Sequence, residues 1–180
     1  MGESALWYAV SVRTRHEKAV AFLLGNKGYA TFLPLYEARR RCCDRVSHLF
    51  LPLFPGYVFC QFDARFRLPI LTTSGVMQIA GNGRVPIPVE PSELDAVRAI
   101  IRSGLPSEPW LGVRAGDYVR IAFGALAGLE GIVLRAQGKH RLVVMINLIQ
   151  RGVAVEIEGE CVEHIRHPQA PLTTGLGRGR

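Results

Sequence analysis

The stretch Pro52–Phe59 reads Pro-Leu-Phe-Pro-Gly-Tyr-Val-Phe and combines a strand pattern with features that a core strand does not need. Its second half runs on to Phe62, is rich in aromatic and β-branched residues, and predicts a buried strand. The Pro-Gly pair predicts a tight bend with aromatic side chains on both sides of it. Such side chains are typical anchors of protein interfaces. The stretch therefore predicts a binding surface, and the alternative that Phe54 and Tyr57 only close the local core stays open.

Strand and helix patterns alternate on both sides of this stretch. The polar segment Arg39–Arg45 joins two apolar runs, and it therefore predicts a solvated hairpin tip. Pro91 and Ser92 predict the start of the last helix, with Ser92 as the cap and Asp95 reaching back to it. The predicted strands are Trp7–Val12, Thr31–Ala38, Val46–Leu51, Gly56–Phe62 and Val76–Ala80, and the predicted helices are Glu17–Lys27, Ala64–Thr73 and the segment that begins at Pro91. The order predicts an α+β fold, in which helices pack against an antiparallel sheet in an α/β sandwich.

The second half of the chain contains strand patterns only. The five candidates are Tyr118–Ile121, Gly131–Ala136, Leu142–Leu148, Val153–Glu158 and Val162–Ile165. Five short strands in so small a unit predict a β-barrel, because closure removes the exposed edges. The predicted organisation is a first domain over residues 5–103, a linker over 104–113, a second domain over 114–167 and a disordered tail over 168–180.

Composition narrows the class of protein. A formal net charge of +7 favours polyanionic or acidic partners. The four cysteines include no C-x-x-C pair, and the five histidines form no metal-spaced or nucleophile-spaced group. We therefore expect reduced thiols, no metal, no cofactor and no enzymatic activity. No apolar run is long enough to span a bilayer and no secretory signal is visible, so we expect a cytoplasmic protein without a membrane partner.

Two sets of motifs resemble the NusG family of transcription elongation factors. The segment Gly116–Val133, with its repeated glycines, resembles a KOW motif, which implies a five-stranded SH3-like barrel. Trp7–Val10, Phe54–Phe59, Ser74–Val76 and Pro86–Pro88 follow the order and spacing of the NusG amino-terminal domain, called NGN. The resemblance covers nearly the whole chain and implies a monomeric factor that binds RNA polymerase and modulates pausing, termination and antitermination.

The resemblance also implies where the polymerase binds. In the family, the NGN domain docks through a hydrophobic depression onto the paired clamp helices of the β′ subunit. The matching positions here are Trp7, Tyr8, Phe54, Pro55, Tyr57 and Phe59. A contact with the β gate loop is a further expectation, although RfaH has His-Thr-Thr-Thr where this chain has Phe66-Arg67-Leu68-Pro69.

The branch of the family and its nucleic-acid contacts follow from other segments. The run from Leu53 to Asp63 and the residues before Leu148 look more like the specialised paralogues RfaH and UpxY than like housekeeping NusG.

The resemblance places Arg13, Arg15 and His16 against upstream or non-template DNA near the transcription bubble. Arg39, Arg40 and Arg41 at the hairpin tip can add sequence-independent attraction to phosphates. A solvated loop explains both groups equally well.

The resemblance assigns a second partner to the barrel. Leu148, Ile149 and Arg151 match the edge through which family members bind the termination factor Rho or a small-subunit ribosomal protein. The alternative that Leu148 and Ile149 only fill the barrel stays open. A competing function is that of a KOW-type RNA-binding protein associated with ribosomes or translation, for which the first domain would be an accessory.

Overall fold

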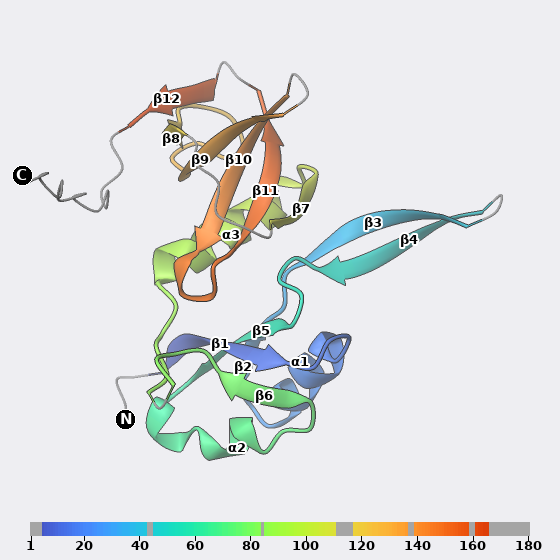
Figure 1. The fold of residues 1–180 in the computed structure, drawn as a ribbon, viewed down its shortest axis with the longest axis vertical. Coiled ribbons are helices and arrows are strands. Elements are labelled where there is room, and N and C mark those ends of the chain that lie inside the picture. The colour runs from blue at the N-terminus through green and yellow to red at the C-terminus, as the bar shows by residue number, and fades with distance from the viewer. Residues whose placement is uncertain are drawn as a thin grey trace, which may run out of the picture.

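The computed structural model describes residues 5–42, 45–83, 85–110, 117–136, 139–158 and 161–165, in two bodies and a projecting ribbon (Figure 1). The tail predicted over 168–180 lies outside the described residues. The elements of the first half are β1 (Leu6–Val12), α1 (Glu17–Asn26), β2 (Ala30–Phe32), β3 (Leu35–Cys42), β4 (Arg45–Pro52), β5 (Tyr57–Phe62), the 3-10 turn η1 (Ala64–Phe66), α2 (Leu68–Leu71), β6 (Val76–Ile79) and α3 (Pro91–Ser103). Gly28, with φ +85, follows the end of α1 and confirms the expected helix stop.

The first sheet has the order β2-β5-β1-β6 and all its pairs are antiparallel. Its two faces follow the alternation of side chains along a strand. One face, with Tyr8, Val10 and Val58, packs in a cluster with Val20 and Leu24 of α1. The other face, with Ala9, Phe59 and the partly buried Trp7 and Tyr57, packs in the cluster that contains the buried residues of α3. The expected sandwich of helices on both faces of an antiparallel sheet is confirmed.

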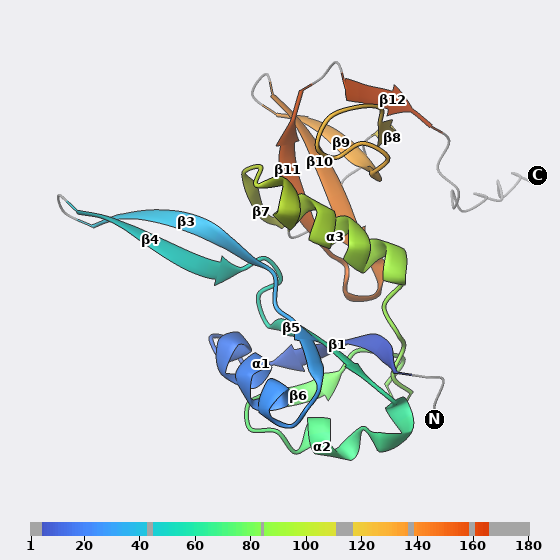
Figure 2. The ribbon, with the colours of Figure 1, turned by 180° about the vertical axis from the view of Figure 1, so that it is seen from behind.

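The strand predicted over Thr31–Ala38 is in fact two strands that belong to different sheets. Pro34 separates them, because proline has no amide hydrogen to donate to a strand ladder. Strand β2 pairs with β5 in the first sheet, whereas β3 pairs only with β4, in register from Leu35↔Pro52 to Cys42↔Arg45. This two-stranded ribbon extends away from both bodies (Figures 1 and 2).

The start of helix α3 differs from its prediction. The cap position is Glu90, without a side-chain hydrogen bond, and Pro91 occupies the first turn. Ser92 therefore lies inside the helix, and the predicted capping box with Asp95 is wrong. A proline at the first helical position is already fixed near the helical φ and lacks the amide hydrogen that would need a cap, which explains the earlier start. Gly104, with φ +68, ends the helix.

The second half forms a six-stranded antiparallel sheet with the order β12-β8-β9-β10-β11-β7. Five of its strands correspond to the five predicted ones. The sixth, β7, was predicted to be part of the linker, and this prediction is wrong over Ser107–Trp110, which pairs with Val155 to Gly152 of β11. The elements are β7 (Ser107–Trp110), β8 (Asp117–Ile121), β9 (Glu130–Ala136), β10 (Lys139–Ile146), the 3-10 turn η2 (Asn147–Ile149), β11 (Arg151–Ile157) and β12 (Val162–His164).

The two bodies share one continuous core. Helix α3 lies beside β7, β10 and β11 of the second sheet in both views (Figures 1 and 2). Its residues Leu94, Val97 and Ile100 belong to a cluster that includes Phe59 of the first sheet and Leu142 of the second. The helix therefore bridges the two bodies. Within the described residues, no helix is long and apolar enough to cross a lipid bilayer.

Candidate protein-binding surface

The Pro-Gly bend is a type II turn held by a buried carboxylate. The amide of Tyr57 donates to the carbonyl of Phe54 at 3.0 Å, and Gly56 has φ +82, which suits glycine at the third position of this turn. The Gly56 amide donates to Oε1 of Glu17 at 2.8 Å, and the carbonyl of Gly56 accepts from Val12 at 2.9 Å. Glu17 is only 4% exposed. The bend is therefore tied to both α1 and β1, and Pro55 is held in an exposed position.

The structure divides the six predicted clamp-binding residues into three groups. Phe54 and Phe59 are fully buried against each other, with ring centroids 5.2 Å apart in an edge-to-face contact. Tyr8 is buried on the opposite face of the sheet, where it packs on Phe62. Trp7 and Tyr57 are half-buried and Pro55 is exposed, so these three can meet a partner. The prediction of exposed anchors is wrong for Tyr8, Phe54 and Phe59, because the strand alternation and the turn direct these rings into the core.

An arginine of α3 completes the aromatic face. The guanidinium carbon of Arg98 lies 5.0 Å from the ring centroid of Trp7 and 5.2 Å from that of Phe32. Arg98 also donates to Asp95 at 2.8 Å, which holds it in place between the two rings. Such cation–π contacts favour close packing of a charged side chain on an aromatic face. We use the name aromatic face for Trp7, Pro55, Tyr57 and Arg98.

The loop predicted to bind a second partner lies against α3. Oε1 of Glu93 accepts hydrogen bonds from the amide of Asn147 at 3.2 Å and from its Nδ2 at 2.7 Å. Burial is the main cause that raises the pKa of the Glu93 carboxyl above its ordinary value, and repulsion from Glu90 adds to it, while the Asn147 bonds act in the opposite direction. Ile149 is buried, and Leu148 and Arg151 are half-buried. The loop thus has a structural role in this arrangement.

The two predicted nucleic-acid groups lie apart in the fold. Arg13, Arg15 and His16 are exposed in the turn between β1 and α1, and Arg15 has the unusual φ of +67 for a residue other than glycine. No salt bridge links these three to another described residue. Arg39, Arg40 and Arg41 lie in β3 towards the far end of the ribbon, and their side chains lie outside what the structure describes.

Three features of the site could not be found from local sequence patterns. Glu17 lies 39 residues from the amide that it holds, and Glu93 lies 54 residues from Asn147. Arg98 meets its aromatic partners because α3 packs in the same cluster as the face of the first sheet that carries Trp7. Both glutamates lie in the first turn of a helix, where a negative charge is favourable by itself. This local pattern does not indicate that either one also binds a distant residue.

Comparison with known proteins gives consistent results over most of the chain. The family model described as transcription termination factor nusG matches residues 5–98, more than half of the chain. The chain is 30% identical over 125 residues to the transcription termination/antitermination protein NusG of Deinococcus radiodurans, a match that covers 59% of the chain and 65% of the relative. It is 26% identical over 176 residues to the NusG of Halalkalibacterium halodurans, and this match covers 88% of the chain and 98% of the relative.

The fold also has a solved counterpart. A structure of Thermotoga maritima NusG, which describes a domain interaction in that protein, aligns with a TM-score of 0.58 at 22% identity. The alignment covers 89% of this chain and 97% of that one. At this level of identity the likeness supports the two-part fold and not the function of individual residues.

Proposed function

Because the chain belongs to the NusG family of transcription termination factors, we propose that it is a transcription elongation factor that binds RNA polymerase and modulates pausing, termination and antitermination. The observation that supports this most is the aromatic face, where the half-buried Tyr57 and the exposed Pro55 belong to a turn fixed by Glu17 and Trp7 lies further along the same face of the sheet. A rigid apolar surface of this kind costs little conformational entropy when it binds.

The proposed partner of the aromatic face is the pair of clamp helices of the β′ subunit. Pro55 and Tyr57 would contact the helices, and Trp7 would extend the contact further along the same face of the sheet. Phe54 and Phe59 would act from beneath, since their buried contact supports the turn. Tyr8 would have no direct role, because it faces α1. The exposed Phe66 and Leu68, on η1 and α2, would offer an apolar contact to the β gate loop. They stand where RfaH has His-Thr-Thr-Thr, so this contact would lack the threonine hydroxyl groups.

The proposed nucleic-acid contacts are electrostatic. Arg13, Arg15 and His16 are exposed and form no described ion pair, so the two arginines offer charge and the histidine a hydrogen-bonding ring to upstream or non-template DNA. The ribbon carries Arg39, Arg40 and Arg41 away from the two bodies, where they could reach a duplex beside the polymerase. Contacts with phosphates would strengthen binding without selecting a sequence.

The second sheet would recruit a further partner, either Rho or a small-subunit ribosomal protein, through the loop at Leu148, Ile149 and Arg151. Ile149 is buried and must become accessible before it can take part. We also propose that the protein is a specialised paralogue that acts on particular operons. The proposed role includes no chemical step and requires neither a cofactor nor a metal.

Single-round transcription in vitro tests this function. Purified RNA polymerase is stalled, released in the presence of the protein, and followed through a pause site and a Rho-dependent terminator. The proposal expects a changed pause half-life or a changed fraction of read-through, and expects Tyr57→Ala to abolish the change. A protein that leaves both unchanged but binds ribosomal RNA would favour the competing RNA-binding function.

A further inference from the structure

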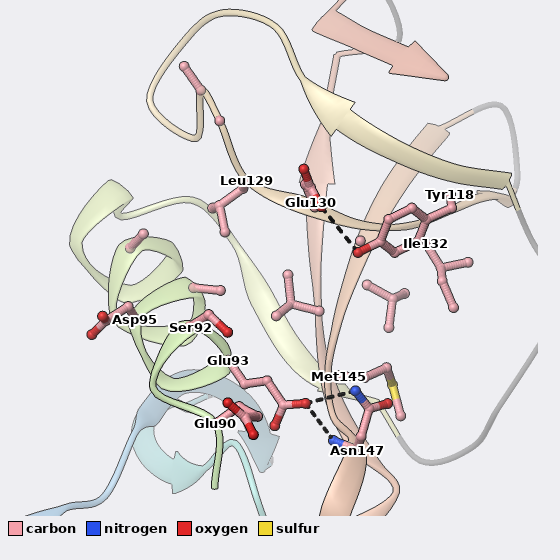
Figure 3. Close-up of a pocket in the computed structure, with 17 residues that line it drawn as sticks. Glu90, Ser92, Glu93, Asp95, Tyr118, Leu129, Glu130, Ile132, Met145 and Asn147 are labelled. Carbon is pink, nitrogen blue, oxygen red and sulfur yellow. Dashed lines mark hydrogen bonds between the residues drawn. The ribbon is translucent and has the colours of Figure 1, made fainter. Parts of the chain in front are cut away.

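A pocket of about 700 Å³ lies between α3 and the second sheet (Figure 3). Ala96 and Ala99 of α3 form one wall. Ile132, Val143, Val144 and Met145 line the opposite side. Val143 and Val144 are buried, whereas Ile132 and Met145 are half-buried. The volume is within the range of pockets that bury a ligand or a few side chains, ~300–1,000 Å³. The half-buried Ile132 and Met145 therefore leave apolar surface that a further segment can cover.

Carboxylates line the helix side of this pocket. In Figure 3, the cap residue Glu90 and Ser92, Glu93 and Asp95 of α3 lie opposite Tyr118, Ile132 and Met145. Asp95 forms an ion pair with Arg98. Within the part of the chain that the structure describes, Glu90 and Glu93 form no ion pair, and the repulsion between them contributes to the raised pKa of Glu93. An apolar wall that faces uncompensated negative charge suits a segment with apolar and basic side chains.

The chain leaves the described structure beside this pocket. Strand β12 pairs with β8, and the amide of Ile165 donates to the carbonyl of Tyr118 at 3.1 Å. The side chain of Tyr118 itself lines the pocket. The printed sequence continues with residues 166–180, which contain Leu172, Leu176 and three arginines and no acidic residue. These residues lie outside the described part of the chain.

We propose that residues 166–180 bind in this pocket, with Leu172 or Leu176 against the apolar wall and Arg178 and Arg180 near Glu90 and Glu93. The length permits it, because 15 extended residues span up to about 50 Å. The tether favours it, because a short linker gives an attached segment an effective concentration of about millimolar. A segment bound there would touch both α3 and the second sheet and would hold the two bodies together.

Photo-cross-linking in the full-length chain tests this proposal without polymerase, so its result is independent of the proposed function. Leu176 is replaced by p-benzoylphenylalanine. The purified protein is irradiated, digested and analysed by mass spectrometry. An equal mixture of light and heavy-isotope protein shows whether each cross-link joins one chain or two. The same label at Phe22, an exposed position on α1, is the control.

The expected result is cross-links within one chain, from position 176 to peptides that contain Met145 or the first half of α3. Arg178→Glu with Arg180→Glu should reduce them at least about fivefold, because charge attraction becomes repulsion. Glu90→Lys should also reduce the cross-links, and so should 0.5 M salt, which screens the attraction between the charges. Cross-links that join light to heavy chains would assign the pocket to a second copy and overturn the proposal. Absent or scattered cross-links would overturn it as well.

Discussion

Glu17 is a buried carboxylate whose described partner is a backbone amide 39 residues away. A buried polar group that loses its partner costs about 1–3 kcal/mol. We expect Glu17→Ala to lower the free energy of unfolding by about this amount, because the Gly56 amide is left without an acceptor. Glu17→Gln keeps an acceptor oxygen and should cost less than half as much. Urea denaturation followed by circular dichroism measures both, and equal stability of the alanine variant would contradict the assigned role.

Glu93 provides a pH test at the same scale. Its pKa is raised in the folded protein above the ordinary value of 4.5, mainly by burial. The folded state therefore holds this proton at pH values where the unfolded state has lost it, and the contribution of Glu93 to stability falls as pH rises from 4.5 through the raised pKa. We expect Glu93→Gln to gain stability relative to the parent protein as pH rises through that window, since glutamine still accepts from Asn147 and carries no charge.

The measurement is the difference between the unfolding free energies of Glu93→Gln and the parent protein from pH 4 to pH 8. Taking the difference removes the titrations of other carboxylates, such as Asp63, whose pKa is lowered by its bonds to Arg65. A difference that is flat, or that decreases as pH rises, would contradict this assignment.

At the scale of the element, the β3–β4 ribbon is stabilised mainly by its own ladder. Isolated two-stranded hairpins are marginally stable, so its loss should cost the rest of the fold little, less than about 1 kcal/mol. Replacing residues 39–48 by Asn-Gly joins Ala38 to Leu49, which already face each other across the ribbon. We expect unchanged folding but weaker binding to bubble DNA, because four arginines are removed. The slope of log affinity against log salt should fall by roughly 2 to 4.

The control for this deletion is the ribbon with Arg39, Arg40 and Arg41 replaced by glutamine. It keeps the ladder and should reproduce most of the loss in DNA affinity. If the shortened protein binds DNA as tightly as the parent protein at all salt concentrations, the ribbon has no role in nucleic-acid binding.

Elements with strong local signals could be predicted, and elements defined by distant partners could not. Periodicity and turn residues located β1, α1, β5 and the five strands from β8 to β12. Strand β7 has two prolines in or beside it, which locally indicate a linker, and it forms a strand only because β11 offers an unpaired edge. The division of one predicted strand into β2 and β3 at Pro34 likewise depends on distant partners, because β2 pairs with β5 and β3 with β4. For the site, the turn at Pro55 and Gly56 was predictable, whereas the inward direction of Phe54 depends on tertiary packing.

At the scale of the whole molecule, α3 connects the two bodies through a shared core. The aromatic face lies on its first-sheet side, and the loop with Leu148 and Ile149 lies on its second-sheet side. Strand and helix patterns could predict each body separately. They could not predict that α3 packs against both bodies, because the apolar residues of α3 form a pattern that any buried helix shows. The arrangement places both proposed binding surfaces within reach of one helix.

Binding of RNA polymerase through the aromatic face is tested by the affinity of the full chain for purified RNA polymerase core enzyme, measured by biolayer interferometry. Pro55→Glu and Phe22→Glu each add a carboxylate at an exposed apolar position, the first on the aromatic face and the second on α1. We expect the parent protein to bind, Pro55→Glu to lose at least about tenfold in affinity, equivalent to about 1.4 kcal/mol, and Phe22→Glu to bind like the parent protein. Equal affinity of the two variants, or no binding by the parent protein, would contradict it.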